Sequence, residues 1–198
     1  AITAGADAIF FLCVDEGMAT AVADRCADAG VLLIGESRPL MDSDGKYVCP
    51  MVMLDAADCG AQCAQWICDN AESLNFDLSD TSKIGIMIGL DSRILNETWR
   101  ADAAADVFVN ELDVSKDDIV YADVAGATVD DKMLAGSEVA STIISSNPDV
   151  ELWLAVGVED DIAVGMCRAL ETNNYADKAI LSSVGGERVV GLWAEGQG

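Results

Sequence analysis

The sequence of 198 residues contains no histidine. Histidine is the side chain most often used for proton transfer near neutral pH, and it is the commonest metal ligand. The sequence also has no C-x-x-C pair, no phosphate-binding G-x-x-x-x-G-K-[ST] loop, no G-x-G-x-x-G turn and no G-x-S-x-G elbow. These absences disfavour an enzyme such as a doubly wound hydrolase. We therefore expect no catalytic residue, no metal site and no cofactor.

Positive charge is scarce, since 11 Lys and Arg residues face 35 Asp and Glu residues and the formal net charge is −24. Proteins bind phosphate backbones by releasing counterions with Lys and Arg, and anionic membrane surfaces attract the same cations. The acidic residues are spread along the whole chain, which is typical of a solvated surface. We therefore expect neither a nucleic-acid partner nor attachment to an anionic membrane surface.

Long apolar runs are also missing. The longest covers residues 9–14, far below the roughly eighteen residues that cross a bilayer. Residues 1–6 are typical of the end of a helix that leads into a strand. We therefore expect the chain to be a central fragment of a longer protein, so the lack of a secretion signal carries no information about its location.

The seven cysteines are an odd number, and no histidine accompanies them. This pattern indicates neither a disulfide framework nor a zinc site. Most of them occupy positions where a strand or a helix would face a core, so we expect most to be small buried apolar side chains. The seven are Cys13, Cys26, Cys49, Cys59, Cys63, Cys68 and Cys167.

Short apolar runs recur along the chain, and the intervals between them carry apolar residues at helical spacing. Because these runs are apolar throughout rather than alternating, they are typical of strands that are buried on both faces of a parallel sheet. The order of strands and helices predicts an α/β fold with doubly wound parallel sheets. The predicted strands cover residues 8–14, 31–34, 83–90, 119–125, 150–158 and 179–184.

One interval breaks this rhythm. After the run at 31–34, the chain passes through a polar turn at 42–45 into an extended piece at 47–54, and a helix begins only at about residue 56. A strand, a crossing segment and a new helix are typical of a chain that passes from one lobe to another. We predict a partial N-terminal lobe at 1–50, a hinge at 51–55 and a nearly complete C-terminal lobe at 56–198.

Ligands of open α/β sheets bind beyond the carboxyl ends of the strands. Carboxylates and a few arginines follow the predicted strands there, and they suit a polyhydroxylated or cationic small molecule. The alternative is structural, because acidic residues in the first turn of a helix stabilise its dipole and Asn96 could be an N-cap. The polar residues at these ends include Asp15, Glu36, Ser37, Asp91, Arg93, Asn96, Arg100, Glu159, Asp160, Asp161 and Arg188.

Several stretches carry a family resemblance: AGADAI at 4–9, ADAGVLLI at 27–34, PMVML at 50–54 with Gly60, and WLAVG at 153–157. In their order and spacing they resemble the type I periplasmic sugar-binding proteins, the solute-binding subunits of ABC importers. Within that family the similarity is greatest to the arabinose-binding members. The resemblance implies a two-lobe fold of periplasmic-binding-protein type I, and it covers only the middle of the family's chain.

The resemblance also implies ligand contacts. In the first lobe, Cys13 lies where a strand meets the ligand, Glu36 and Ser37 replace two adjacent aspartates, and Leu54 is an apolar contact at the hinge. In the second lobe, Asn96 and Arg100 match a threonine and an arginine that hold the sugar. The remaining matches are Val158 and Glu159 at a methionine-asparagine pair, and Gly185 and Arg188 at an asparagine and an aspartate.

Only Arg100, the acid at Glu36 and some apolar contacts are retained from the arabinose binders. The departures at Ser37, Glu159, Gly185 and Arg188 therefore favour a ligand that differs from arabinose in shape or charge.

The leading interpretation is an extracytoplasmic solute-binding subunit, periplasmic or a cell-surface lipoprotein, that binds a sugar or similar small polar ligand between two lobes and presents it to an ABC permease. The alternative is the ligand-sensing domain of a lactose-repressor-type regulator or of a chemoreceptor partner, and the acidity favours the importer. The apolar residues Phe10, Phe11, Leu12, Leu32 and Leu33 are expected to need cover, which predicts self-association of the partial first lobe.

Overall fold

The computed structural model describes residues 1–13, 15–127 and 131–196. The chain divides into two compact units, Ala1–Asp55 and Ala56–Gly198, called unit 1 and unit 2 below. Short 3-10 helices occur at Ile2–Ala4, Glu16–Met18, Glu72–Leu74, Thr81–Lys83, Lys116–Asp118 and Val124–Gly126. Among the helices of the described ranges, none combines the length and the apolar character needed to cross a membrane.

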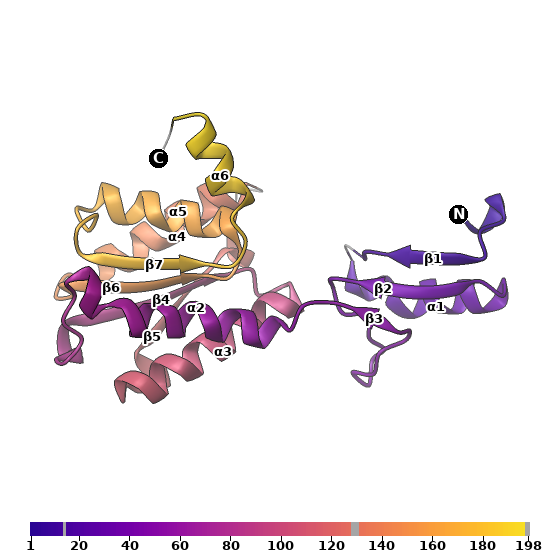
Figure 1. Cartoon of the computed structure of the whole chain (residues 1–198), viewed down its shortest axis with the longest axis horizontal. Helices are drawn as coiled ribbons and strands as arrows, with labels where there is room; N and C mark the ends of the chain where they lie inside the picture. The colour runs from indigo at the N-terminus through magenta and orange to yellow at the C-terminus, as the bar shows by residue number, and fades with distance from the viewer. Residues whose placement is uncertain (14, 128–130, 197–198) are drawn as a thin grey trace. The chain divides into compact units, whose positions relative to one another are not determined.

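Unit 2 contains a four-stranded sheet in the order β5-β4-β6-β7, and every neighbouring pair of strands is parallel (Figure 1). This confirms the α/β prediction for the second half of the chain. The strands are β4 (Ile84–Leu90), β5 (Ile119–Asp123), β6 (Leu152–Gly157) and β7 (Ala179–Ser183). The helices are α2 (Ala56–Asn70), α3 (Leu95–Leu112), α4 (Lys132–Ser146), α5 (Asp160–Thr172) and α6 (Glu187–Ala194). The strand predicted at 119–125 ends two residues early, because a 3-10 helix begins at Val124.

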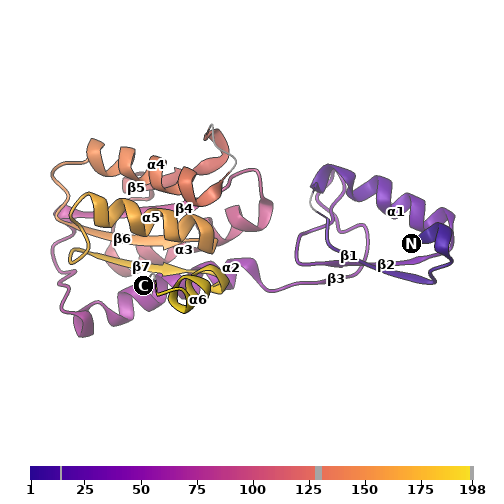
Figure 2. The same ribbon diagram turned by 90° about the horizontal axis from the view of Figure 1, so that it is seen from above.

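Helices cover both faces of this sheet, as Figure 2 shows from above. On one face, Ile86 and Ile88 of β4 pack with Phe108 of α3 and with α2 residues in one apolar cluster. On the other face, Met87 of β4 packs with residues of α4 and α5, including Met166. Successive residues of β4 thus point into two different cores, which explains why this strand is apolar along its whole length.

The helices of each layer touch closely, and glycine allows it. Gly60 of α2 lies against the backbone of Arg100 in α3, where an added methyl group would overlap the Arg100 carbonyl. Gly165 of α5 lies in the same way against the carbonyl of Met133 in α4. These two contacts fix how far apart the helices sit, and hence where the first turns of α3 and α4 meet the strand ends.

Unit 1 contains a three-stranded parallel sheet in the order β1-β2-β3 and one long helix. The strands are β1 (Ala8–Phe11), β2 (Leu32–Glu36) and β3 (Met51–Val52), and the helix is α1 (Ala19–Asp28). The strand predicted at 8–14 is therefore shorter than expected, and Val14 itself lies outside the described residues.

One face of the unit 1 sheet is open. Phe10 and Leu32 are 59% and 55% exposed, and Leu12 is also exposed. The prediction that Phe11 and Leu33 need cover is wrong, because both point to the opposite face: Leu33 is buried and Phe11 packs on a small cluster with Cys13, Ala19 and Leu40. Self-association through the open face stays a prediction.

The cysteines depart from the expectation that most are buried. Of the seven, Cys13 and Cys26 are buried, Cys167 is exposed and the other four are intermediate. All seven are free thiols. The buried side of α2 consists of Ala56, Gly60, Ala64 and Ile67, so its three cysteines lie beside that side and not on it.

Candidate functional site

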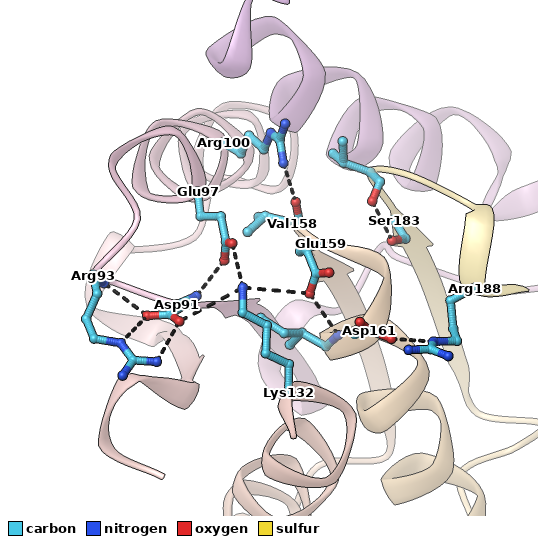
Figure 3. Close-up of polar contacts among 12 residues, drawn as sticks. Asp91, Arg93, Glu97, Arg100, Lys132, Val158, Glu159, Asp161, Ser183 and Arg188 are labelled. Atoms are coloured by element: carbon cyan, nitrogen blue, oxygen red, sulfur yellow. Dashed lines mark hydrogen bonds and ion pairs between the residues drawn. The ribbon is translucent and has the colours of Figure 1, made fainter. Parts of the chain in front are cut away.

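The candidate site of unit 2 lies at the carboxyl ends of β4, β6 and β7, where each strand passes into α3, α5 and α6. Figure 3 shows the polar side chains that meet there. Asp91 directly follows β4, and Val158 and Glu159 connect β6 to α5. Parallel strands bring these ends to the same edge of the sheet, which is where α/β proteins bind ligands.

Asp91 is the first anchor of this edge. Its side chain is almost fully buried, and Arg93 donates two hydrogen bonds of 2.8 Å to it, from Nε to Oδ1 and from Nη2 to Oδ2. The backbone N–H of Arg93 donates a third bond to Oδ1 at 3.1 Å. The hydrogen bonds from Arg93 lower the pKa of the Asp91 carboxyl despite its burial. Asp91 is therefore a paired structural carboxylate rather than a free ligand contact.

Glu97 is the second anchor, and it is only 3% exposed. Its Oε2 accepts the backbone N–H of Asp91 at 2.7 Å, and its Oε1 accepts a hydrogen bond of 2.9 Å from Lys132 Nζ. The same ammonium lies 3.9 Å from Asp91 Oδ2 and 4.0 Å from Glu159 Oε2. Lys132 thus stands among three carboxylates that come from three different segments (Figure 3).

Lys132 reaches this place because it is the first residue of α4. Asp131 is the N-cap of this helix, and its Oδ1 accepts the backbone N–H of Leu134 at 2.9 Å. The cap fixes the start of α4, and with it the direction in which Lys132 leaves the helix.

Glu159 is the N-cap of α5 and is 26% exposed. Its Oε2 accepts the backbone N–H of Ile162 at 3.4 Å, which is long for a hydrogen bond. Burial raises the pKa of the Glu159 carboxyl, and the ammonium of Lys132 opposes that rise. The structural alternative is therefore correct in part, since Glu159 does cap a helix. Its carboxylate is nevertheless held loosely and retains accepting capacity.

Arg100 donates a hydrogen bond of 2.9 Å from Nη1 to the carbonyl of Val158. Arg100 lies in the second turn of α3, which begins at Leu95. Asp102 and Asp106, the acidic residues that follow it on the same helix, lie 3.8 and 3.0 Å from Lys116. The guanidinium instead points toward the end of β6 (Figure 3).

Two buried polar atoms near this place have no hydrogen-bond partner among the described residues: Nε of Arg100 and Oδ1 of Asn96. Asn96 is not the N-cap of α3, because that position is Ile94 and Asn96 lies inside the helix. Arg100 also influences a thiol that the sequence gave no reason to place here. Burial raises the pKa of the Cys63 thiol in α2, and a hydrogen bond with Ser182 and the charge of Arg100 only partly oppose that rise.

Gly185 and Arg188 belong to the turn after β7. Gly185 and Gly186 have φ angles of 106° and 150°, which L side chains rarely adopt. This turn lets Asp160 Oδ2 accept the backbone N–H groups of Gly186 and Arg188 at 3.2 and 2.9 Å. Arg188 itself pairs with Asp161, beside a hollow of about 450 Å³ between α5 and α6.

The predicted contacts of unit 1 have their own local geometry. Cys13 is buried and its thiol donates to the carbonyl of Asp15 at 2.9 Å. Glu36 ends β2, and the hydroxyl of Ser37 donates to Glu36 Oε1 at 3.0 Å. Ser37 has a φ of 61°, and Leu54 is 73% exposed. Their roles as ligand contacts stay predictions.

Within unit 2 the structure therefore brings Arg100, Val158 and Glu159 together. It adds Glu97 and Lys132, which sequence reasoning missed. The only local signal for Lys132 is the Asp131 cap before it, and nothing near it in sequence points to Glu97, 35 residues away.

Both a family model and solved structures match this chain. The family model described as periplasmic binding protein domain matches residues 1–197. A comparison with curated proteins found no match.

Among solved structures, the chain is similar to a periplasmic solute-binding protein of an ABC transporter from Actinobacillus succinogenes with bound D-allose, at a TM-score of 0.72 and 18% identity. It is also similar to a Caulobacter myo-inositol binding protein with bound myo-inositol (TM-score 0.72, 17% identity) and to a Chloroflexus aurantiacus carbohydrate transporter solute-binding protein in complex with D-glucose (TM-score 0.72, 16% identity).

The match covers 99% of this chain in each case, and 65%, 63% and 62% of the three solved chains in the order given. This chain therefore spans less than two thirds of their length. At these identities the likeness shows the fold, which is that of the type I periplasmic binding proteins. No likeness to the arabinose binders in particular emerges from these three structures, and that part of the resemblance stays a prediction. The match of the family model over nearly the whole chain decides the assignment: this chain belongs to the periplasmic binding protein domain family.

Proposed function

We propose that the chain is part of an extracytoplasmic solute-binding subunit of an ABC importer, and that it binds a sugar or a similar small polar ligand at the strand ends of unit 2. The observation that carries the proposal is the hydrogen bond from Arg100 to the carbonyl of Val158, the residue that directly precedes Glu159. Guanidinium N–H groups donate to hydroxyl oxygens, and a carboxylate accepts hydroxyl hydrogens. A polyol needs both.

Several features support this choice of ligand and role. The solved relatives carry D-allose, myo-inositol and D-glucose, which are all polyhydroxylated and uncharged. The net charge of −24 favours an importer subunit over a regulator that must also approach DNA. The same proposal includes an ABC permease in the membrane as partner, and a location that is either periplasmic or, as a lipoprotein, at the cell surface.

The test is calorimetric titration of the chain with D-allose, D-glucose, myo-inositol and L-arabinose. We expect at least one of them to bind, weakly because the predicted first lobe is only partial, and Arg100→Met to weaken that binding further by about ten- to a hundredfold, the range for losing a hydrogen bond to a charged group. Lys83→Met is the matched control, because Lys83 pairs with Glu151 at the exposed opposite end of β4 and β6. Circular dichroism checks that each variant is folded. The proposal is wrong if no polyol binds, or if Arg100→Met binds as tightly as the unchanged chain.

A further inference from the structure

Lys132 and three carboxylates, Asp91, Glu97 and Glu159, form a cluster at the strand ends of unit 2. Its ammonium is hydrogen-bonded to one carboxylate and lies within 4.0 Å of two others, Asp91 and Glu159. The three carboxylates differ in what else holds them. Asp91 already receives two side-chain hydrogen bonds from Arg93. For Glu97 and Glu159, Lys132 is the cation that the described residues provide within ion-pair distance.

Glu97 is suited to anchor Lys132, because it is nearly inaccessible to water and both of its oxygens are used. Removing the cation from a buried carboxylate strongly destabilises the folded protein. The Lys132 ammonium therefore stays on Glu97 in the folded state. The ammonium donates one hydrogen bond to Glu97, and it lies at ion-pair distance, 3.9 and 4.0 Å, from Asp91 Oδ2 and Glu159 Oε2.

Glu159 has no comparable anchor of its own. Its one described hydrogen bond, from the backbone of Ile162, is 3.4 Å long. Lys132 is therefore the cation that the described residues place within ion-pair distance of the Glu159 carboxylate (Figure 3).

The charged groups that act on Glu159 come from several elements. Lys132 is the positive one, and Asp161 and Glu97 are the negative ones. Asp161 is itself paired with Arg188. An ammonium on the ligand would compete with Lys132 for Glu159, and an anion would meet a carboxylate that is already in place.

We propose that Lys132 is a positioning residue for Glu159, and that it thereby makes the strand-end site selective for uncharged polyols over amino sugars. This inference rests on the proposed function and names the ligand class of the same site. Lys132 does not touch the ligand. It acts by restraining the carboxylate that does and by standing where an ammonium on the ligand would pair with that carboxylate.

The first experiment compares D-glucose with D-glucosamine at about pH 6, below the ordinary pKa of an α-amino group, so that the amine is protonated. Calorimetry gives both affinities for the unchanged chain, Lys132→Met and Lys132→Arg. We expect Lys132→Met to lower the ratio of glucose affinity to glucosamine affinity by at least about tenfold, and Lys132→Arg to keep it within about twofold of the original. If Lys132 were only structural, both ligands would weaken together. An unchanged ratio in a folded Lys132→Met protein overturns the inference.

Lys132→Met leaves Glu97 buried without its cation and could unfold unit 2. The double variant Glu97→Gln with Lys132→Met removes both charges and keeps the comparison available. It should show the same change of ratio, and an unchanged ratio there has the same meaning. Lys83→Met is again the matched control, since Lys83 is far along the sheet from Glu159 and should leave the ratio unchanged.

The second experiment needs no ligand, so it separates this inference from the proposed function. Carbon NMR of chain labelled at glutamate side chains follows the titration of Glu159, which is assigned by the signal that Glu159→Gln removes. Lys132 lowers the pKa of Glu159, whereas Asp161 on the same helix and Glu97 on α3 raise it together with burial. We expect the double variant, in which both Glu97 and Lys132 are neutral, to titrate differently from Glu97→Gln alone, with the higher pKa. Equal pKa values in these two variants would refute the positioning role even if sugars bind.

Discussion

Gly60 offers the sharpest test of how the helices that carry the site are packed. It lies inside α2, and a methyl group at its Cα would overlap the carbonyl oxygen of Arg100 in α3. Helix propensity alone would make Gly60→Ala stabilising by about 1 kcal/mol. Overpacking costs roughly 1–3 kcal/mol or more, and here the atoms that must move are backbone. We therefore expect a net loss of about 2 kcal/mol in the free energy of unfolding of unit 2.

The matched control is Gly191→Ala in α6, where nothing lies within 4 Å of the added carbon. That substitution should stabilise by about 0.5–1 kcal/mol, because only the helix propensity changes. Urea unfolding can be followed by tryptophan fluorescence, which reports unit 2 alone because all 4 tryptophans follow residue 55. A loss of about 2 kcal/mol corresponds to roughly 4–8 °C in Tm for a domain of this size. A Gly60→Ala protein as stable as the unchanged chain would show that α2 and α3 are not locked together as described.

Three further outcomes follow from single contacts. The hydrogen bonds from Arg93 lower the pKa of Asp91 in the folded state, so the stability they provide is full above the ordinary aspartate pKa and is lost as the pH falls through the lowered value. Arg93→Met should therefore reduce the loss of unfolding free energy on acidification. Urea unfolding at a series of pH values measures it, and an identical pH dependence in both proteins would contradict this. The hydroxyl of Tyr175 donates to the carbonyl of Val150 at 2.6 Å, so Tyr175→Phe should cost about 1 kcal/mol, and an unshifted urea midpoint would speak against it. Burial raises the pKa of Cys68 to about 11, so little of it is thiolate, the form that reacts, near neutral pH. Mass spectrometry should therefore find that iodoacetamide alkylates Cys68 more slowly than a model cysteine peptide. An equal rate would count against the burial.

The sheet of unit 2 was predictable because its strands have to be apolar on both faces. β4 and β6 lie in the middle of the sheet, so every position of 84–90 and 152–157 faces a helix layer, and the sequence shows this as unbroken apolar runs. The start of α3 was less predictable. Asn96 was a candidate N-cap because asparagine favours that position, whereas Ile94 holds it in the structure and makes no side-chain cap hydrogen bond.

The site was only partly predictable, because local pattern shows which residues follow a strand and not which of them are already used. Asp91 and Arg188 look like ligand contacts in the sequence, and in the structure each is held by an ion pair. Lys132 looks like an ordinary surface lysine at the start of a helix, and it is placed by two carboxylates 35 and 27 residues away. Those distances along the chain carry no periodic signal.

The same separations have a consequence for the order in which the molecule acquires its parts. The bond from Lys132 to Glu97 spans 35 residues and the bond from Arg100 to Val158 spans 58. Closing such loops costs entropy before the contacts return any free energy. The pairing of β4 with β6 closes a still longer loop, from Ile84 to Leu152, and once it has formed it brings Val158 within reach of Arg100. The contacts at the strand ends therefore depend on the sheet. Hydrogen exchange during refolding should protect the amide of Asp91, which is bonded to Glu97, no earlier than the amides in the middle of β4.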